Sequence, residues 1–507
     1  MVVISYLKLF QPRSRGFQLQ ARLCTMATEH QHFLTSDNMN PNIRKMDYPV
    51  HGPLVVRAGQ LEKELKNGVK KPFKEILKLD IGDCHAMGQL PITFVRQVMA
   101  MVFYPPLLDD PRFPDDTKER AQTILNACKG GSIGSYTDAT GLEIIRKHAA
   151  EFIEKRDGIP CNWENVTLYG GATDGIKKIL KLFVNETNGK RAGVMIPIPQ
   201  YPVYSTTLDE FGLHQIRYYL DEDQNWGVNI EEMQRTIDEA KKVCNPKVLV
   251  IINPGNPTGQ VFTRKNIEEI IQFAYKENLY ILADEVYQDN IYSETSKFYS
   301  FKKVLTEMGE PYVNMELASF MSCSKGYVGE CGFRAGITEI LNMCPKVQAM
   351  FYKANTAMLC PPSTGQACIE PFIRPPEKGE PSYDLFIKEK EDILNSLKVR
   401  AKLIVETFNS FEGITCNEVQ GAMYAFPRIR LPPKVIETAK NRNQSPDEFY
   451  ASEVLENTGI CIVPGEAYGQ VPGTYHFRTT TLLPLDKMKI MLERLEAFHR
   501  EFMDRYR

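Results

Sequence analysis

The sequence of 507 residues has little of what a membrane protein, a nucleic-acid-binding protein or a metal-stabilised scaffold needs. It contains no run of about 18 consecutive apolar residues, so it predicts no transmembrane helix. Its formal net charge is only −2, and acids and bases are mixed along the chain, so no basic surface for nucleic acid is expected. Its 12 cysteines form no C-x-x-C pair and no Cys/His cluster at zinc spacing. This pattern favours a reducing compartment and predicts no metal site.

The composition is that of an ordinary globular protein, with 43% hydrophobic and 24% charged residues, and the length allows two domains. A Pro- and Gly-rich break occurs at Pro375–Pro381. We expect an N-terminal arm with part of a small domain over residues 46–105, a large domain over 106–385 and a C-terminal small domain over 386–507.

Residues 1–28 differ from the rest because they are basic and free of acids. Four basic residues precede the first acid, Glu29, and apolar and hydroxyl residues lie between them: Lys8, Arg13, Arg15 and Arg22. This is typical of a mitochondrial transit segment and favours the matrix, although a plain disordered tail is the alternative. Met26 offers a second start, so a cytosolic form is also expected.

Short apolar runs alternate with segments of helical periodicity from about Val166 onward. Ile176, Ile179, Leu180 and Phe183, for example, recur at the spacing of one buried helix face. The alternation predicts an α/β fold with a mostly parallel, doubly wound sheet. The predicted strands are Val166–Tyr169, Gly193–Ile196, Lys247–Ile252, Tyr280–Ala283 and Leu317–Met321.

Each predicted strand is followed directly by a chemically suggestive segment. Open α/β sheets bind ligands outside the carboxyl ends of their strands, so these segments are expected to meet in one site. In chain order they are Gly170–Thr173, Pro199–Tyr201, Asn253–Gly259, Asp284–Tyr287 and the stretch that contains Lys325.

Lys325 lies between hydroxyl residues and glycines in the stretch Ser322–Gly336. A lysine amine forms a Schiff base if its pKa is lowered, and serines with Arg334 offer donors suited to a phosphate. Pyridoxal phosphate, an aldehyde that carries a phosphate, needs both. The plain alternative is a surface lysine in a Gly-rich turn.

The other requirements of this cofactor have candidates at the same strand ends. The ring nitrogen needs a buried carboxylate, for which Asp284 is the candidate, unless that residue only pairs with a neighbouring donor. Tyr287 and Asn256 are candidates for the phenolic oxygen. Tyr201 is the candidate for the ring face, unless it is a core tyrosine.

The phosphate and the substrate also have candidates. Ala172 and Thr173 open a predicted helix, where backbone N–H groups bind phosphate, and Ser324 adds a hydroxyl. Arg478 is suited to the α-carboxylate of an amino acid, and a surface ion pair is the alternative.

These motifs resemble those of the class I/II aminotransferases, which have the aspartate aminotransferase fold. The resemblance covers about Met46–Arg507 and implies a large, mostly parallel-sheet domain that binds pyridoxal phosphate, plus a smaller α+β domain. The motifs are Asn253–Gly259, Asp284-x-x-Tyr287, Ser322-x-Ser324-Lys325 and Arg334-x-Gly336.

Within the family, several segments resemble the alanine aminotransferases: His51–Glu62, Gly82–Thr93, Pro197–Pro202, Ser324–Gly332 and Gly473–Arg478. The resemblance implies ping-pong exchange of an amino group between L-alanine and 2-oxoglutarate, giving pyruvate and L-glutamate. Lys325 is then the Schiff-base lysine and proton shuttle, with Asp284 and Tyr201 as its catalytic partners.

The resemblance also assigns binding roles. It implies that Ala172, Thr173, Ser322 and Arg334 hold the phosphate, and that Gly52, Asn256 and Arg478 bind the substrate. It implies a homodimer in which Tyr136 reaches the phosphate of the neighbouring subunit. Glu466, near Pro464, departs from the expected pattern of small uncharged residues.

Three alternatives remain open. Glutamate:glyoxylate aminotransferases share these motifs, but the basic leader and the lack of a peroxisomal C-terminal signal argue against them. Relatives that form rings or eliminate β-substituents use the same cofactor residues. A catalytically silent ligand sensor would need a DNA-binding segment, and the first fifty residues show no helix-turn-helix pattern.

Overall fold

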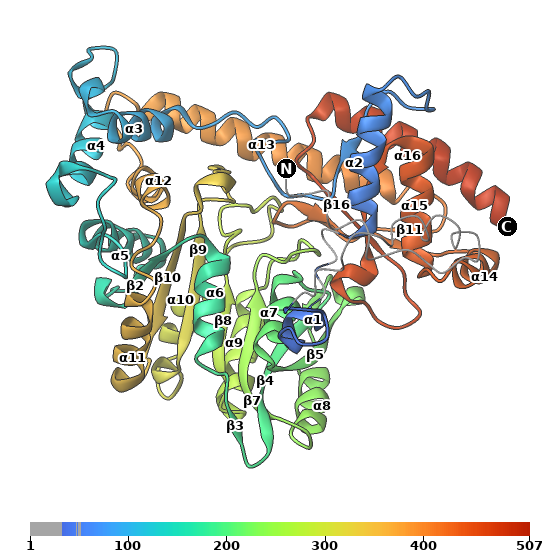
Figure 1. The fold of residues 1–507 in the computed structure, drawn as a ribbon, viewed down its shortest axis with the longest axis horizontal. Helices are drawn as coiled ribbons and strands as arrows, with labels where there is room; N and C mark the ends of the chain where they lie inside the picture. Colours follow the sequence, from blue (N-terminus) through green and yellow to red (C-terminus); the bar gives the residue numbers. More distant parts are fainter. Residues whose placement is uncertain (1–32, 47, 49–51) are drawn as a thin grey trace. The chain divides into compact units, whose positions relative to one another are not determined.

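Apolar and β-branched runs build the central sheet of the computed structural model, which describes residues 33–46, 48 and 52–507 (Figure 1). The expected transit segment and Met26 lie outside the described residues. The strands are β2 (Val166–Tyr169), β3 (Glu186–Thr187), β4 (Lys190–Ile198), β5 (His214–Asp221), β6 (Gly227–Val228), β7 (Asn245–Ile252), β8 (Tyr280–Asp284), β9 (Leu317–Ser322) and β10 (Gly336–Leu341). Their order is β2-β10-β9-β8-β7-β4-β5-β6, with β3 paired to β4.

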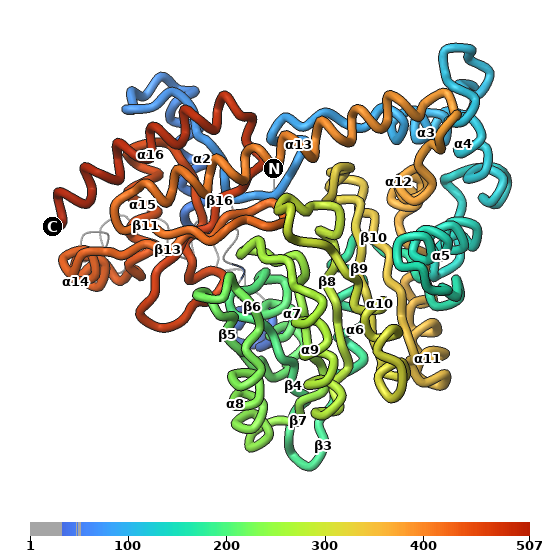
Figure 2. The backbone as a smooth tube through the Cα atoms, turned by 180° about the vertical axis from the view of Figure 1, so that it is seen from behind, coloured from blue at the N-terminus to red at the C-terminus, as the bar shows by residue number. Residues whose placement is uncertain are grey.

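Alternate residues of each central strand enter different apolar clusters on the two faces of the sheet. In β7, Val248 and Val250 pack with helices α6 (Ala172–Lys181) and α7 (Val203–Phe211). Leu249 and Ile251 pack on the other face with α8 (Ile230–Ala240), α9 (Arg264–Lys276) and α10 (Phe301–Glu307). Figures 1 and 2 show these helices on the opposite faces, which confirms the doubly wound sheet.

The sheet is mostly parallel. Strands β4, β5, β7, β8 and β9 pair in parallel, whereas β10 runs antiparallel to both β2 and β9. All five predicted strands are confirmed, but β5 and the antiparallel β10 were not predicted. The carboxyl ends of β2, β4, β7, β8 and β9 therefore lie at one edge, as the site prediction requires.

The rest of residues 46–507 packs as helices around two further clusters. One cluster holds α3 (Thr93–Phe103), α4 (Asp115–Ala127), α5 (Glu143–Asp157) and α12 (Ser363–Ile373). The other holds the C-terminal helices and short strands: α13 (Tyr383–Phe408), α14 (Pro433–Asn441), α15 (Pro446–Thr458), α16 (Leu485–Tyr506), β11 (Ile414–Thr415), β12 (Tyr424–Ala425), β13 (Arg428–Ile429), β14 (Ile460–Cys461), β15 (Val463–Pro464) and β16 (Phe477–Thr480). The long helix α13 joins both clusters, through Phe386 at its start and Leu397 further along.

The remaining elements are α2 (Pro53–Lys66), β1 (Leu77–Lys78), which pairs with β14, and α11 (Pro345–Thr356). Residues 46–507 form one unit, and α1 (Pro41–Lys45) belongs to a separate N-terminal unit. The predicted domain boundaries at 105/106 and 385/386 stay predictions.

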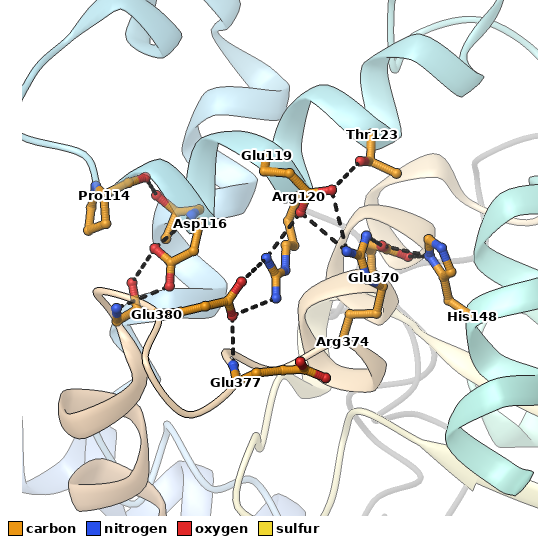
Figure 3. Close-up of polar contacts among 12 residues, drawn as sticks. Pro114, Asp116, Glu119, Arg120, Thr123, His148, Glu370, Arg374, Glu377 and Glu380 are labelled. Carbon is orange, nitrogen blue, oxygen red and sulfur yellow. Dashed lines mark hydrogen bonds and ion pairs between the residues drawn. The ribbon is translucent and has the colours of Figure 1, made fainter. Parts of the chain in front are cut away.

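The Pro375–Pro381 break is held against α4 by polar contacts (Figure 3). Glu380 accepts hydrogen bonds of 2.6 and 2.7 Å from Arg120, whose side chain is buried. Just beyond the break, Ser382 donates to both carboxylate oxygens of Asp116. The break thus connects α12 to α13 as an anchored turn.

Among the described helices, none combines the length and the apolar character that crossing a bilayer requires. Likewise, no cluster of three or more His, Cys, Asp or Glu side chains suited to a metal occurs in the described ranges.

Candidate active site

A cavity of about 250 Å³ opens at the carboxyl ends of the central strands. Its walls bring together eleven of the predicted site residues, which come from segments far apart in the sequence. These are Ala172, Thr173, Tyr201, Asn256, Asp284, Tyr287, Ser322, Ser324, Lys325, Arg334 and Arg478.

Lys325 follows β9, and its Nζ donates a 3.0 Å hydrogen bond to the carbonyl oxygen of Gly82. Burial acts to lower its pKa, but the electrostatic influence of the acidic side chains of Tyr424, Cys331 and Cys84 outweighs burial and raises the pKa above the usual value. The Schiff-base chemistry considered from sequence requires a lowered pKa. The opposite shift in the cofactor-free protein arises because these acidic groups come from distant segments that converge on the amine.

Asp284 ends β8 and is buried. Its Oδ2 accepts a 2.7 Å hydrogen bond from the hydroxyl of Tyr204, whereas Oδ1 has only a 3.5 Å contact from the backbone N–H of Val286. Burial raises the pKa of Asp284 to about 6. A buried carboxylate with one strong donor keeps the capacity to accept another charged hydrogen bond.

The start of α6 also lines the cavity. Gly171 has a φ of 87°, a conformation that favours glycine, and the helix begins at the next residue. A Cβ on Gly336 would lie 2.6 Å from the carbonyl carbon of Gly171 and 2.7 Å from the nitrogen of Ala172. Glycine at 336 therefore lets β10 pass directly against the helix start, and Arg334 donates to the carbonyl of Gly170 at 3.3 Å.

The two predicted serines differ in their surroundings. The Ser322 hydroxyl donates to the carbonyl oxygen of Ala335 at 3.2 Å and accepts from the N–H of Ser324 at 3.1 Å, so it already holds the loop together. The Ser324 hydroxyl is buried and has no hydrogen-bond partner among the described residues.

Arg478, on β16, is a buried cation rather than the surface ion pair considered from sequence. Its guanidinium lies 4.2 Å from the ring centre of Tyr424 and 4.8 Å from that of Tyr468. Nη1 donates to Oδ1 of Asn256 at 3.3 Å and Nη2 donates to the carbonyl of Asp80. Its Nε has no partner within the described part of the chain. The fork is thus held in place while its Nε–H stays uncommitted.

Two aromatic hydroxyl contacts complete the walls. The hydroxyl of Tyr201 lies 3.1 Å from that of Tyr48, and Tyr287 donates to Tyr424 at 3.4 Å. Sequence reasoning missed Tyr48, Tyr204, Tyr424, Asp80 and Gly82 as site residues. The spacing of Tyr204 could have identified it as a site residue, because it follows the predicted site residue Tyr201 by three positions. Nothing in the sequence around Gly82 identified it as a site residue. In the structure a Cβ at this position would collide with the Tyr424 hydroxyl.

Two predicted residues do not line the cavity. The side chain of Tyr136 is exposed. Gly52 precedes α2 and lines a different hollow, together with Glu448 and Glu466. The roles of Tyr136 and Gly52 stay predictions, and Glu466, the departure from the family pattern, does not line the cavity that holds Lys325.

Known proteins share both the sequence and this architecture. The profile of the family Aminotransferase class I and II matches residues 78–495. The chain is 54% identical over 475 residues to alanine aminotransferase 2-like from Danio rerio, which covers 93% of this chain and 86% of that protein. It is 52% identical to alanine aminotransferase 1 from Homo sapiens, over 93% and 96% of the two chains.

The chain belongs to the class I and II aminotransferases.

The expected fold of this aminotransferase is also confirmed. The alanine aminotransferase from Pyrococcus furiosus superposes with a TM-score of 0.72 at 21% identity, covering 91% of this chain and 99% of that one. The aspartate aminotransferase from Thermus thermophilus superposes with a TM-score of 0.68 at 15% identity, covering 91% and 99%. At such identities the likeness establishes the fold alone.

Proposed function

We propose that this aminotransferase exchanges an amino group between L-alanine and 2-oxoglutarate, giving pyruvate and L-glutamate, with pyridoxal phosphate as cofactor. The names of relatives at 51–54% identity, all alanine aminotransferases, support L-alanine as a substrate. The observation that carries the proposal is that an amine, a buried carboxylate and a buried guanidinium, those of Lys325, Asp284 and Arg478, line one cavity.

The groups that lack partners fit the cofactor. Asp284 has one strong donor, which leaves an oxygen for a protonated ring nitrogen. The unpartnered hydroxyl of Ser324 and the start of α6 suit a phosphate. Pyridoxal phosphate, when bound, supplies an aldehyde for the amino group and a ring that accepts electrons from the α carbon. Lys325 would hold that aldehyde through its amine.

Arg478 binds the α-carboxylate of the substrate. Contacts with Asn256 and with the carbonyl of Asp80 fix the guanidinium plane before substrate arrives. A preorganised fork loses little freedom on binding a carboxylate, and burial strengthens the ion pair. Because the same guanidinium serves both half-reactions, L-alanine and 2-oxoglutarate must bind in turn.

Lys325 Nζ moves the proton of the α carbon. Its hydrogen bond to the Gly82 carbonyl and its position 5.6 Å from the centre of the Tyr287 ring hold the amine inside the cavity. A positioned general base of this kind contributes ~10²–10⁴-fold to the rate. Burial keeps bulk water from competing for the proton.

A single-turnover experiment tests the function. The purified, cofactor-loaded enzyme receives L-alanine with no 2-oxoglutarate. We expect one equivalent of pyruvate and a change in the visible absorbance of the cofactor. L-glutamate should form only when 2-oxoglutarate is added afterwards. Absence of pyruvate contradicts the proposal, and faster turnover with glyoxylate than with 2-oxoglutarate would favour the glyoxylate enzymes instead.

We also propose that the enzyme is a homodimer with shared active sites. The exposure of Tyr136 outside the cavity of its own chain supports this proposal, because a partner could then receive the side chain. Other large apolar side chains, such as Leu90 and Tyr104, are exposed as well.

We further propose that the full-length chain enters mitochondria and that a form starting at Met26 stays in the cytosol. The basic leader supports import, and a relative from Dictyostelium discoideum at 43% identity is named a probable mitochondrial alanine aminotransferase. Cell fractionation of chains tagged at the C-terminus, starting at Met1 or at Met26, tests this. A purely cytosolic full-length chain contradicts import.

A further inference from the structure

A buried histidine lies two residues before Arg478 and does not line the cavity that holds Lys325. We propose that His476 is a positioning residue for Arg478. It ties the start of β16 to the carboxyl end of β5 and so keeps the guanidinium where the carboxylate of the substrate binds. This inference rests on the proposed function, in which Arg478 binds that carboxylate.

Strand β16 has only short ladders to hold it in its sheet. Two residue pairs join it to β12 and two join it to β15. An isolated antiparallel bridge between Arg428 and His476 extends the pairing by one position before the strand begins. Side-chain contacts at this end of β16 therefore matter for where the strand lies.

His476 and Arg478 are related by the period of the strand, since alternate residues point to the same face. Each stacks on an aromatic ring of the segment that contains β12. The ring of Phe426 lies 4.8 Å from that of His476 at an angle of 2°, and the ring of Tyr424 lies 4.2 Å from the Arg478 guanidinium. The two stacks are side by side, so a shift of the first is expected to move the second.

Both ring nitrogens of His476 face acceptors. Nε2 lies 3.2 Å from each carboxylate oxygen of Glu222, and Nδ1 lies 2.9 Å from Oε1 of Gln470. The amide of Gln470 is oriented by its own nitrogen, which donates to Asp447 at 3.0 Å. Because an imidazole nitrogen donates only when it carries a proton, both contacts are hydrogen bonds when the ring is doubly protonated.

Glu222 belongs to the central sheet side of this contact. It begins the short helix η7 (Glu222–Gln224), directly after β5. Its backbone carbonyl accepts a 2.6 Å hydrogen bond from Asn417, and its carboxylate also lies 3.5 Å from Arg428. The contact with His476 spans 254 positions of sequence and joins the end of β5 to the start of β16.

Loss of this anchor should affect Arg478 rather than the cofactor. Asn256 and the carbonyl of Asp80 hold the guanidinium end of the side chain, whereas His476 holds the backbone from which the side chain starts. The hydrogen-bond partners of His476 are Glu222 and Gln470, and neither lines the cavity. A displacement of about 1 Å at a group that positions the substrate can cost ~10²-fold.

His476→Phe tests the proposal, because a phenyl ring can keep the stack on Phe426 but removes both hydrogen bonds. The cofactor-loaded variant is mixed with increasing L-alanine, and single-turnover absorbance changes give an apparent Kd and a saturated rate. We expect the apparent Kd to rise about tenfold to a hundredfold, as for the loss of a hydrogen bond to a charged group. The saturated rate and the Kd for pyridoxal phosphate should stay close to those of the wild type.

The same rise is expected for 2-oxoglutarate with the aminated enzyme, since Arg478 serves both half-reactions. Glu222→Ala is the second variant. It removes the partner of His476 from a partly exposed position and should raise both Kd values in the same direction. Unchanged substrate affinity in these variants overturns the proposal. An equal loss of affinity for pyridoxal phosphate would indicate general damage to the fold and would overturn it as well.

The chain supplies a matched control in a second buried contact between a histidine and a glutamate (Figure 3). Nδ1 of His148 lies 2.8 and 3.0 Å from the two carboxylate oxygens of Glu370, which also pairs with Arg374. Neither His148 nor Glu370 lines the cavity. His148→Phe removes the same kind of contact and should leave the substrate Kd values unchanged. An equal rise in this control would overturn the specific role of His476.

A double-mutant cycle tests whether His476 acts through Arg478. Arg478→Lys removes the fork that the anchor would position, so His476→Phe should raise the Kd much less in that background than in the wild type. Full additivity would show that His476 acts by another route, which overturns the proposal. If Arg478→Lys alone leaves the affinity for L-alanine unchanged, the proposed function of Arg478 is wrong. An effect of Arg478→Lys without an effect of His476→Phe overturns the positioning role only.

Discussion

Lys325 and Asp284 follow neighbouring strands, and each has a pKa above its usual value for a different reason. Burial alone disfavours the charged form of Asp284, whereas acidic neighbours favour the charged form of Lys325. Without cofactor, Asp284 therefore takes up its proton at a higher pH than an ordinary aspartate, and Lys325 keeps its proton to a higher pH than an ordinary lysine. A protonated ring nitrogen beside Asp284 would favour its charged form.

Replacing Lys325 tests its covalent and proton-transfer roles together. Lys325→Ala should reduce kcat by at least ~10²–10⁴-fold because no other amine lies within the described cavity walls. The visible absorbance of the attached cofactor should disappear as well. Steady-state kinetics and absorbance spectra check both effects. Lys388→Ala, which removes an exposed lysine paired with Asp392, should change neither, and normal activity in Lys325→Ala would refute the assignment.

Asp284 predicts how the stability of the cofactor-free protein depends on pH. Its pKa is about 6 in the folded protein and about 3.9 when unfolded, so the unfolded state releases its proton first as pH rises. Folding is therefore penalised progressively as pH rises from about 4 to about 6, and by about 3 kcal/mol above that range. Asp284→Asn cannot ionise and should escape the penalty.

Urea unfolding of the cofactor-free protein measures this effect. Near pH 7 we expect Asp284→Asn to be more stable than the wild type by up to about 3 kcal/mol, with the difference vanishing near pH 4. Tyr204→Phe is the companion variant. It removes the donor that favours the carboxylate, so the pKa of Asp284 should rise further. A stability difference that is the same at both pH values would contradict the assignment.

At the scale of elements, the connection from β9 to β10 builds much of the site. The chain leaves the sheet after Ser322, carries Lys325 and Arg334 past the cavity, and returns at Gly336 antiparallel to β9. Because β10 pairs with β2 as well, the returning chain is pressed against the start of α6. The pairing of β10 with both neighbouring strands thus fixes the positions of Lys325, Arg334 and the start of α6 relative to one another.

Gly336→Ala tests this packing. The added Cβ would meet backbone atoms of Gly171 and Ala172, which cannot rotate away. We expect a loss of about 1–3 kcal/mol in stability, as for other overpacked sites. If the start of α6 moves, the Kd for pyridoxal phosphate should rise about tenfold, which corresponds to about 1.4 kcal/mol.

Cofactor titration and urea unfolding measure the two effects, and Gly332→Ala is the control. Gly332 lies in the same connection, but a Cβ there has nothing within 4 Å. It should behave as the wild type. Equal effects of the two substitutions would show that the connection responds to any added methyl group rather than to contact with α6.

Strand β10 also shows why part of the sheet could not be predicted from the sequence. The five apolar strands were predictable because burial on both faces leaves a continuous hydrophobic run. Strand β10 contains Glu339, which is buried, and a buried acid argues against a central strand. The structure pairs it with Lys302 at 2.6 Å, a contact between distant positions that no local pattern reveals.

The same distinction between local patterns and distant contacts applies to the residues of the site. The residues that follow strand ends, such as Asp284 and Lys325, were predictable because sheet topology brings strand ends together. Tyr424 and Gly82 were not, because they reach the cavity only through the packing of the C-terminal segments and the arm against the sheet. The sequence spacing between Gly82 and Tyr424 says nothing about their contact.

At the scale of the whole molecule, the cavity depends on contacts between the ends of the aminotransferase unit. Arg478 donates to the carbonyl of Asp80, although the two residues are separated by 398 positions. A contact of such sequence separation requires closing a long loop, so it depends on the complete fold. Cofactor bound at this junction should stabilise both segments together, since it binds only the folded state.

The remaining question at this scale is whether one chain makes a complete site. The Tyr136 hydroxyl is predicted to donate to the cofactor phosphate of the partner. Hydrogen bonds to charged groups contribute about 1.5–3 kcal/mol, so Tyr136→Phe should weaken cofactor binding and lower activity at limiting cofactor. That result alone does not distinguish a contact within one chain from a contact between chains.

Mixed dimers make the distinction. When Tyr136→Phe and Lys325→Ala chains are co-expressed, a mixed dimer with shared sites has one site that combines the intact Lys325 of the first chain with the intact Tyr136 of the second. With random pairing we expect about a quarter of wild-type activity at limiting cofactor, well above either variant alone. If Tyr136 served only its own chain, every site with an intact Lys325 would still lack the hydroxyl, and mixing would restore nothing. With two differently tagged chains purified through both tags, only mixed dimers remain, so shared sites predict about half of wild-type activity and unshared sites predict no restoration.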